Sequence, residues 1–133
     1  AIVADWKSAL DFIEHHDDAR ATGYLGLSMG TIMGLPVCVA DERIAVAVLG
    51  LMGFWGPNKN DLVQLAPELS IPIRFLMQWD DEVVPRDRCL ELFDAVGSEH
   101  KSLHTNPGTH RNVPASEVEA AVHYLASQLA EIA

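Results

Sequence analysis

The sequence predicts an α/β domain in which a parallel sheet carries helices on both faces. Short apolar runs typical of buried strands alternate with segments of helical periodicity, in the order α-β-α-β-α-β-α-β-α. Strands that alternate with helices run parallel and connect by right-handed crossovers, which place helices on both faces of the sheet. The length of 133 residues, with 49% hydrophobic and 21% charged residues, suits a single globular domain over residues 1–133.

The helices are predicted from the spacing of apolar residues. From Val3 to Ile13 these recur at intervals of three or four residues, which predicts an amphipathic helix over residues 2–16. Ser116 and Glu119 have the spacing of a capping box, so Ser116 is expected to cap the last helix. The five predicted helices cover residues 2–16, 28–40, 59–66, 85–96 and 116–132.

The strands are predicted from apolar runs that turn signals bound. Residues 44–51 form a continuous apolar run with several β-branched residues, which suits an interior parallel strand. A polar connection that includes Asp18 and Arg20 is expected between the first helix and the first strand. The four predicted strands cover residues 21–27, 44–51, 72–77 and 101–105.

The charge balance of the chain excludes two classes of partner. Nine Lys+Arg against 19 Asp+Glu give a net charge of -10, so we expect neither a nucleic-acid nor a membrane partner. The stretch from Ala21 to Ala40 has no charged residue, but its glycines and Pro36 favour a strand followed by a buried helix over a membrane span. Cys38 and Cys89 have apolar neighbours, which favours buried free thiols in a reduced, cytoplasmic compartment.

Residues 26–30 form a G-x-S-x-G motif centred on Ser28, between a predicted strand and a predicted helix. A Ser on so tight a turn adopts a strained backbone conformation and directs its hydroxyl into solvent. We expect Gly26 and Gly30 to leave space for neighbouring backbone, and the N–H of Met29 to act as an oxyanion donor at the helix N-terminus. The alternative interpretation is an ordinary helix N-cap, with glycines at four-residue spacing that allow close helix packing.

A nucleophilic Ser needs a base that a third group orients. Asp80 and Asp81 follow the third predicted strand, and Asp81 is the expected acid because it lies in the loop at the carboxyl end of that strand. The alternative is a solvated acidic turn before a helix. His110 follows a Pro-Gly turn after the last predicted strand and is the expected base, because its loop can reach Ser28. His104 lies inside that strand and is expected to be structural.

The sequence offers no pattern for a metal or a nucleotide cofactor. No two His, Cys or acidic residues share a convincing ligand spacing, so no metal site is expected. Neither phosphate-binding motif, G-x-x-x-x-G-K-[ST] or G-x-G-x-x-G, is present. The sequence therefore favours chemistry by side chains, without a cofactor.

Three segments of the chain resemble the α/β-hydrolase family. They are Gly-Tyr-Leu-Gly-Leu-Ser-Met-Gly around Ser28, Gln-Trp-Asp-Asp-Glu-Val-Val-Pro around Asp81 and Pro-Gly-Thr-His ending at His110, in the family's order of nucleophile, acid and His. The resemblance covers essentially the whole chain and is strongest to the cap-poor esterase and dienelactone-hydrolase-like branches. Many members have Gly where this chain has Gln78, and typical dienelactone hydrolases have Cys where it has Ser28.

The resemblance implies that the chain corresponds to the C-terminal part of the family's fold. In the family the nucleophile follows the fifth strand, whereas Ser28 follows the first predicted strand, so about 100 upstream residues are expected to be lacking. They would include the loop that supplies the second oxyanion N–H. The sheet edge at residues 21–27 is then expected to be exposed, and open to self-association or to a second polypeptide that supplies the missing strands.

The resemblance also implies a function: a serine hydrolase that cleaves a small-molecule carboxylic ester or thioester through an acyl-enzyme, without a cofactor. Ser28 would attack the carbonyl, His110 would take the proton and Asp81 would stabilise the imidazolium. Phe54 and Trp55 are candidates for the wall of the acyl pocket, or else are loop aromatics of the core or the surface. The alternatives are a non-catalytic fragment or a binding or scaffold protein of the same fold, and an acyltransferase or perhydrolase that uses the same triad.

Overall fold

The computed structural model describes residues 2–17 and 21–132. Within them, four parallel strands form one sheet in the order β1-β2-β3-β4, with five α-helices and one short 3-10 helix. The strands are β1 (Thr22–Leu25), β2 (Ile44–Gly50), β3 (Ile73–Gln78) and β4 (Lys101–Asn106). The helices are α1 (Ile2–Asp17), α2 (Met29–Ala40), α3 (Lys59–Leu65), η1 (Ala66–Glu68), α4 (Arg86–Ala95) and α5 (Ala115–Ile132). The predicted α/β class and the order of the elements are confirmed.

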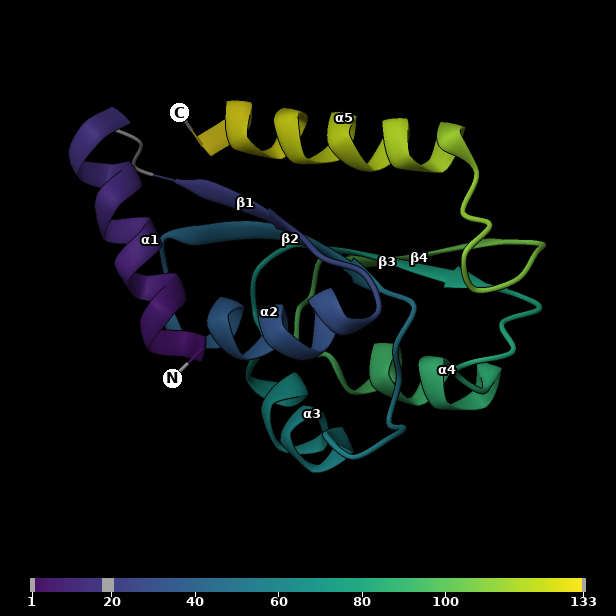
Figure 1. Cartoon of the computed structure of the whole chain (residues 1–133). Coiled ribbons are helices and arrows are strands. Elements are labelled where there is room, and N and C mark those ends of the chain that lie inside the picture. Colours follow the sequence, from purple (N-terminus) through teal and green to yellow (C-terminus); the bar gives the residue numbers. More distant parts are fainter. Residues whose placement is uncertain (1, 18–20, 133) are drawn as a thin grey trace.

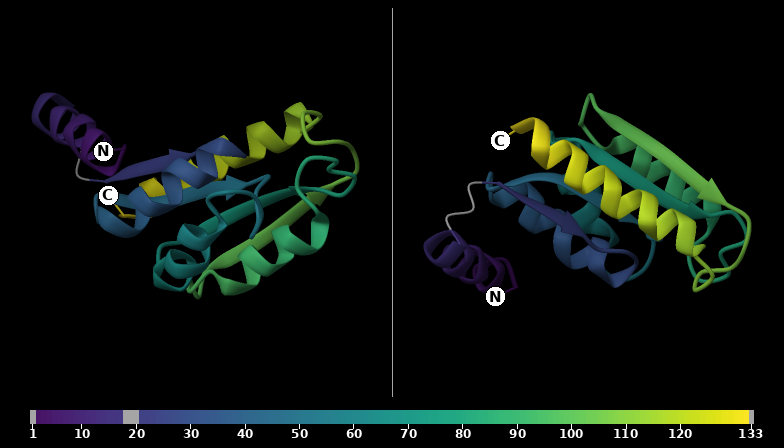
Figure 2. Two further views of the ribbon diagram at one scale, coloured as in Figure 1. Left: turned by 60° about the horizontal axis from the view of Figure 1, so that its bottom comes forward. Right: turned by 90° about the horizontal axis from the view of Figure 1, so that it is seen from above.

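The helices lie on both faces of the sheet, as predicted. Helix α5 covers one face, where Ala121 packs against Val48 of β2 and Leu76 of β3 (Figure 1). Helices α2, α3 and α4 cover the other face, where the larger hydrophobic core includes Phe75. Figure 2 shows the same layers from two further directions, with α1 beside α2 at the β1 end of the sheet. The apolar run of β2 is buried because helices cover both of its faces.

The parallel arrangement brings the ends of the strands to one edge of the sheet. Register pairs Leu25 with Val48, Gly50 with Leu76 and Gln78 with Asn106. The segments that follow β1, β3 and β4 therefore leave the sheet at the same edge. These segments carry the three residues that the sequence predicts to be catalytic.

Most predicted element boundaries differ from the structure by one or two residues, and the differences at β1 and α5 have a clear structural basis. Strand β1 ends at Leu25 because the chain turns away from the sheet at Gly26, although the Gly26 N–H still donates to Val48 O at 3.0 Å. Helix α5 begins at Ala115, so Ser116 lies inside its first turn and the prediction that Ser116 is the cap is wrong. The carbonyl of Pro114 accepts the first helical hydrogen bonds, from the N–H groups of Glu117 at 3.0 Å and Val118 at 3.3 Å, so Pro114 occupies the cap position.

Three further expectations concern the connection after α1, membrane spans and the cysteines. The polar connection expected at Asp18 and Arg20 lies outside the described residues. No helix in the described part of the chain has the length and apolar character needed to cross a membrane. Cys38 in α2 and Cys89 in α4 are buried free thiols, as predicted, and burial raises the pKa of each thiol to about 12.

Candidate active site

Ser28 lies on the turn between β1 and α2 with a backbone φ of 58° and ψ of -114°. A positive φ is rare for a residue with a side chain, so the surrounding structure must hold this conformation. Ser28 occupies the N-cap position of α2, but its side chain makes no capping hydrogen bond. Its Oγ lies 2.9 Å from Nε2 of His110 instead. The side chain of Ser28 therefore does not act as the ordinary helix cap that the alternative interpretation required.

The turn around Ser28 is anchored to the end of β2. The backbone N–H of Ser28 donates to Gly50 O at 2.8 Å. Thr31, which is fully buried, accepts the N–H of Gly50 at 2.9 Å, and its own hydroxyl is 2.8 Å from Gly50 O and 3.0 Å from Gly26 O. One buried hydroxyl thus links the start of α2, the turn and the neighbouring strand. This network fixes the height of Ser28 above the sheet.

The glycines of the motif have different roles. A Cβ at Gly26 would lie 2.6 Å from the ring of Tyr24 and 2.7 Å from the carbonyl oxygen of Gly30, so a side chain is excluded there. A Cβ at Gly34 would overlap the same Tyr24 ring. At Gly30 the nearest atom would be 3.9 Å away, so the prediction that Gly30 avoids a collision is wrong. The Tyr24 ring occupies the space beside Gly26 and Gly34, and its hydroxyl donates to Gly30 O at 2.7 Å.

Met29 is the first residue of α2, directly after Ser28. No acceptor in the described part of the chain takes its backbone N–H. The positive end of the helix dipole lies at the same place, where a developing oxyanion would be stabilised. The Met29 side chain is exposed. The assignment of this N–H as an oxyanion donor stays a prediction.

His110 links Ser28 to Asp81. Oδ2 of Asp81 lies 2.7 Å from Nδ1 of His110, and the Asp81 side chain is 1% exposed. Oδ1 of Asp81 accepts the backbone N–H groups of Val83 at 2.7 Å and Val84 at 2.9 Å. Because a buried carboxylate is an acceptor, Nδ1 carries the ring proton and Nε2 is free to accept the hydroxyl proton of Ser28. The structure therefore brings together the three residues that the sequence singled out.

Comparisons with known proteins bear on the fold of the chain. Neither a protein-family model nor a curated protein matches the chain. Among solved structures, a cold-adapted esterase from an Arctic intertidal metagenomic library is 54% identical, with a TM-score of 0.94 over 97% of this chain and 59% of that one. The chain belongs to the α/β-hydrolase superfamily.

More distant structures show the same fold. An acetyl xylan esterase from Paenibacillus sp. R4 is 16% identical, with a TM-score of 0.77 over 95% of this chain and 52% of its own. Est1E from Butyrivibrio proteoclasticus is 13% identical, with a TM-score of 0.74 over 96% of this chain and 69% of its own. The α/β-hydrolase chain thus spans 59% of the Arctic esterase and about half of the xylan esterase. These lengths agree with the expected C-terminal portion of the fold.

Sequence reasoning missed three residues that hold the loop carrying His110. Gln78, Asp80 and Glu82 each form a hydrogen bond to the backbone of residues 108–110. The sequence analysis considered Asp80 only as another candidate acid, and Asp80 and Glu82 as part of a solvated acidic turn. It noted Gln78 only as a departure from the Gly common in α/β-hydrolases. These residues stand at every second position, and in an extended segment such a spacing directs side chains to one side. This spacing is the only sequence feature that could have indicated their common role.

His104 forms a second Ser–His pair in this α/β-hydrolase. Its Nε2 lies 2.8 Å from Oγ of Ser102. Burial, and the nearby Arg74, lower the pKa of His104, while Glu117 raises it in part. In the part of the chain that the structure describes, no carboxylate is hydrogen-bonded to His104, and Ser102 lies within a regular strand. The pair lacks both the oriented base and the tight turn, which agrees with a structural role for His104.

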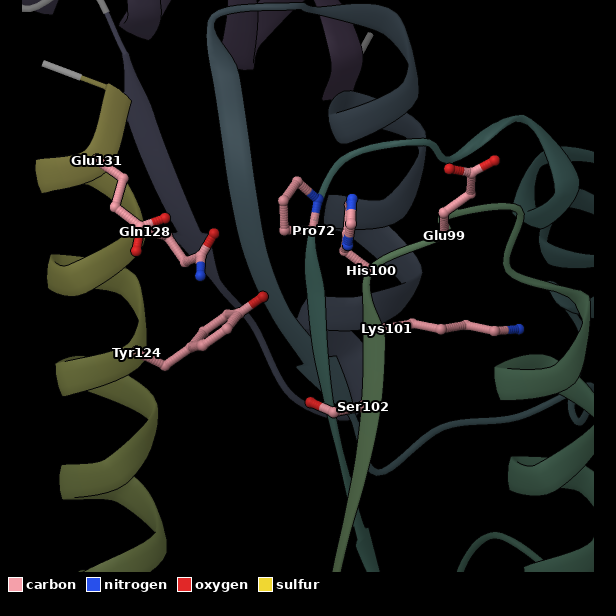
Figure 3. A pocket seen from close by; sticks show the side chains of 8 residues that line it. All are labelled: Pro72, Glu99, His100, Lys101, Ser102, Tyr124, Gln128 and Glu131. Atoms are coloured by element: carbon pink, nitrogen blue, oxygen red, sulfur yellow. The ribbon is translucent and has the colours of Figure 1, made fainter.

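The structure also describes the other candidate features of the sequence. Phe54 packs against the larger core and donates its N–H to Arg88 O at 3.1 Å, while Trp55 is 46% exposed. Their place in an acyl pocket stays a prediction. A cavity of about 550 Å³ lies between α5 and the starts of β3 and β4, lined by Tyr124 and Ser102 among others (Figure 3). It is at the opposite end of the strands from Ser28. Within residues 2–17 and 21–132, no group of three or more His, Cys, Asp or Glu has metal-binding geometry.

Proposed function

We propose that this chain carries the nucleophile, base and acid of a serine hydrolase that cleaves carboxylic esters through an acyl-enzyme. The observation that carries the proposal is the hydrogen-bonded series from Ser28 through His110 to Asp81, with Ser28 on a positive-φ turn. The 54% identity to an esterase supports ester hydrolysis as the chemistry. The substrate class is a small-molecule ester or thioester.

In the proposed mechanism, Oγ of Ser28 forms a bond to the carbonyl carbon of the ester while Nε2 of His110 takes the hydroxyl proton. Asp81 stabilises the resulting imidazolium through Nδ1–H. The tetrahedral intermediate then breaks the bond to the leaving oxygen, which takes the proton from Nε2 and departs as an alcohol. Water repeats the sequence on the acyl-enzyme: its proton goes to His110, its oxygen bonds to the acyl carbon, and Ser28 regains its proton as the acid leaves.

The backbone geometry supports a separate contribution from the start of α2. The N–H of Met29 is unpaired within the described residues and adjoins the nucleophile. A donor aimed at a developing oxyanion changes the rate by about 10²–10³ in acyl-transfer enzymes. We propose that this N–H is one half of the oxyanion hole. The other half would come from a part of the fold that this chain does not span.

The test is covalent labelling with a fluorophosphonate probe, followed by peptide mapping. The protein that carries this chain is expected to be labelled at Ser28. Ser28→Ala is expected to abolish labelling and to lower kcat on a short-chain p-nitrophenyl ester by about 10⁴-fold or more. Asp81→Asn is expected to lower kcat by about 10⁴-fold, because the His110 tautomer is no longer fixed.

The chain supplies its own matched control for this experiment. Ser102 is also hydrogen-bonded to a histidine, at 2.8 Å, but on a regular strand. Ser102→Ala is therefore expected to leave labelling and kcat unchanged. Ester hydrolysis at the wild-type rate by the Ser28→Ala variant would show that Ser28 is not the nucleophile.

A further inference from the structure

Two loops of the candidate site continue the β3–β4 pairing beyond the sheet. The first, residues 78–82, carries Asp81 and is called the acid loop here; the second, residues 106–110, carries His110 and is called the His loop. The N–H of Trp79 donates to Asn106 O at 2.8 Å, and the N–H of Asp80 donates to Gly108 O at 3.0 Å. The backbones of the two loops therefore run as partners up to the catalytic positions.

Side chains of the acid loop bind the backbone of the His loop at three consecutive residues. Nε2 of Gln78 donates to Thr109 O at 3.1 Å, and Oδ2 of Asp80 accepts the N–H of Gly108 at 2.9 Å. Oε2 of Glu82 accepts the N–H of His110 at 3.2 Å. The side chain of Asp81, between them, is hydrogen-bonded to the His110 imidazole. One loop thus determines both the backbone path and the ring orientation of His110.

Asp80 forms the most complete of these contacts. Its N–H donates to the carbonyl of Gly108 and its carboxylate accepts the N–H of the same residue, so the two residues are joined in both directions. Gly108 has a φ of 126°, a conformation that side chains rarely adopt. A Cβ at Gly108 would also lie 3.2 Å from Nε2 of Gln78. A glycine is therefore needed at this turn, and the paired hydrogen bonds with Asp80 hold it two residues before His110.

We propose that Asp80, assisted by Gln78 and Glu82, is a positioning residue that fixes the His loop so that Nε2 of His110 faces Ser28. The proposal rests on the function proposed above. Asp80 is hydrogen-bonded to the backbone of Gly108 and not to the side chain of Ser28 or His110, so it acts through that backbone. A displacement of about 1 Å in a catalytic group costs on the order of 10²-fold in rate, so a backbone contact at this place is expected to affect the chemical step.

The experiment compares Asp80→Ala with Asp80→Asn in ester hydrolysis. Asp80→Ala removes the acceptor for the Gly108 N–H, and we expect kcat to fall about tenfold with KM within about twofold of wild type. Asp80→Asn keeps an amide oxygen at the same place without the charge, and we expect kcat within about twofold of wild type. Glu119→Ala, which removes an exposed carboxylate from α5, is the matched control and is expected to change neither constant.

Three outcomes that would contradict these proposals can be told apart. If wild-type protein shows no Ser28-dependent hydrolysis, the proposed function fails and the positioning role fails with it. If wild type is active and Asp80→Ala has an unchanged kcat, the positioning role alone is overturned. If Asp80→Asn is as slow as Asp80→Ala, the carboxylate acts through its charge and the hydrogen-bond account is overturned.

A second pair of variants tests the same inference through the neighbouring contacts. Glu82→Ala is expected to lower kcat about threefold to tenfold, and Glu82→Gln, which retains an acceptor, is expected to recover it. Amide hydrogen exchange gives a readout besides activity: the Gly108 N–H is expected to exchange about tenfold faster in Asp80→Ala than in wild type. Unchanged exchange in Asp80→Ala, at a melting temperature equal to that of wild type, would overturn the contact on which the proposal rests.

Discussion

The two halves of the candidate site are held by different physical means. The turn that carries Ser28 is held by packing: Gly26 and Gly34 lie against the Tyr24 ring, and the fully buried Thr31 links the turn to β2. The His loop is held by hydrogen bonds from a neighbouring loop, two of them from the exposed carboxylates of Asp80 and Glu82. The side chains that hold the Ser28 turn are packed within the protein, whereas two of the side chains that hold the His loop are exposed to solvent.

This difference predicts how each half responds to a substitution. A change in the Ser28 turn disturbs side chains of the core, so it lowers the free energy of unfolding of the whole domain. A change in the acid loop or the His loop alters local contacts, so it lowers kcat and leaves the free energy of unfolding nearly unchanged. The variants below test that contrast, beginning with the largest expected effect.

Gly50→Ala tests the packing at the end of β2, where Gly50 O accepts the N–H of Ser28. Gly50 has a φ of 146°, and a Cβ there would overlap the carbonyl oxygen of Leu76 on β3. Backbone strain costs about 1–3 kcal/mol and overpacking costs about as much again, so we expect a loss of about 4 kcal/mol in the free energy of unfolding. Urea denaturation followed by circular dichroism measures this loss.

Gly30→Ala is the matched control for Gly50→Ala. A Cβ at Gly30 would have its nearest neighbour 3.9 Å away, so the substitution is expected to change the free energy of unfolding by less than about 1 kcal/mol. It tests whether the last glycine of the G-x-S-x-G motif is required by packing. A Gly30→Ala variant as unstable as Gly50→Ala would contradict the packing described here.

Thr31→Val tests the buried hydroxyl that links the turn to β2. Valine fills the same volume but leaves the Gly50 N–H without its acceptor, 2.9 Å away in the native protein. A buried donor left unpaired costs about 1–3 kcal/mol, so we expect that loss in the free energy of unfolding, together with slower probe labelling of Ser28. Thr31→Ser keeps the hydroxyl and is expected to lose less than about 1 kcal/mol. If Thr31→Val and Thr31→Ser had equal unfolding midpoints, the Thr31 hydroxyl would not contribute to the stability of the protein.

The Ser28 turn could be predicted from sequence because its determinants are contiguous. A strand pattern, a Gly, a Ser and a helix pattern within ten residues require a tight turn, and Ser28 has the positive φ expected there. The motif could not tell which glycine is sterically required, because that depends on where the Tyr24 ring lies. Gly30 was the wrong choice, and Gly34, four residues along the helix, is the glycine against which the ring packs.

The support of the His loop could not be predicted, because it depends on the pairing of two segments about 30 residues apart. Exposed acidic residues after a strand usually form a solvated turn, and the alternate spacing of Asp80 and Glu82 does not by itself show that they have partners. The path of residues 106–110 determines that they have partners. For the same reason Gln78 looked like a departure from the family, whereas in the structure it is buried and hydrogen-bonded to Thr109.

The two buried thiols offer the most subtle test of the contrast between the halves. Cys38 is in α2, which follows the Ser28 turn, and Cys89 is in α4, which follows the acid loop. Burial raises the pKa of each thiol to about 12, so at pH 8 the thiolate fraction of the folded protein is on the order of 10⁻⁴. An unfolded thiol has a pKa of about 8.5, so the unfolded chain ionises first as the pH rises, and the stability from these groups is lost above about pH 8.5.

Each thiol can be followed alone in a Cys38→Ala or a Cys89→Ala variant, with a disulfide reagent at pH 8 and low urea. In native buffer we expect both thiols to react much more slowly than in the unfolded chain, because burial both raises the pKa of each thiol and keeps the reagent away from it. With urea below the unfolding midpoint, Cys89 is expected to react severalfold faster than Cys38, because α4 follows the acid loop, whose exposed hydrogen bonds open before the packing around the Ser28 turn does. Equal rates for the two thiols at every urea concentration would mean that the halves unfold as one unit and that their different supports confer no difference in local stability.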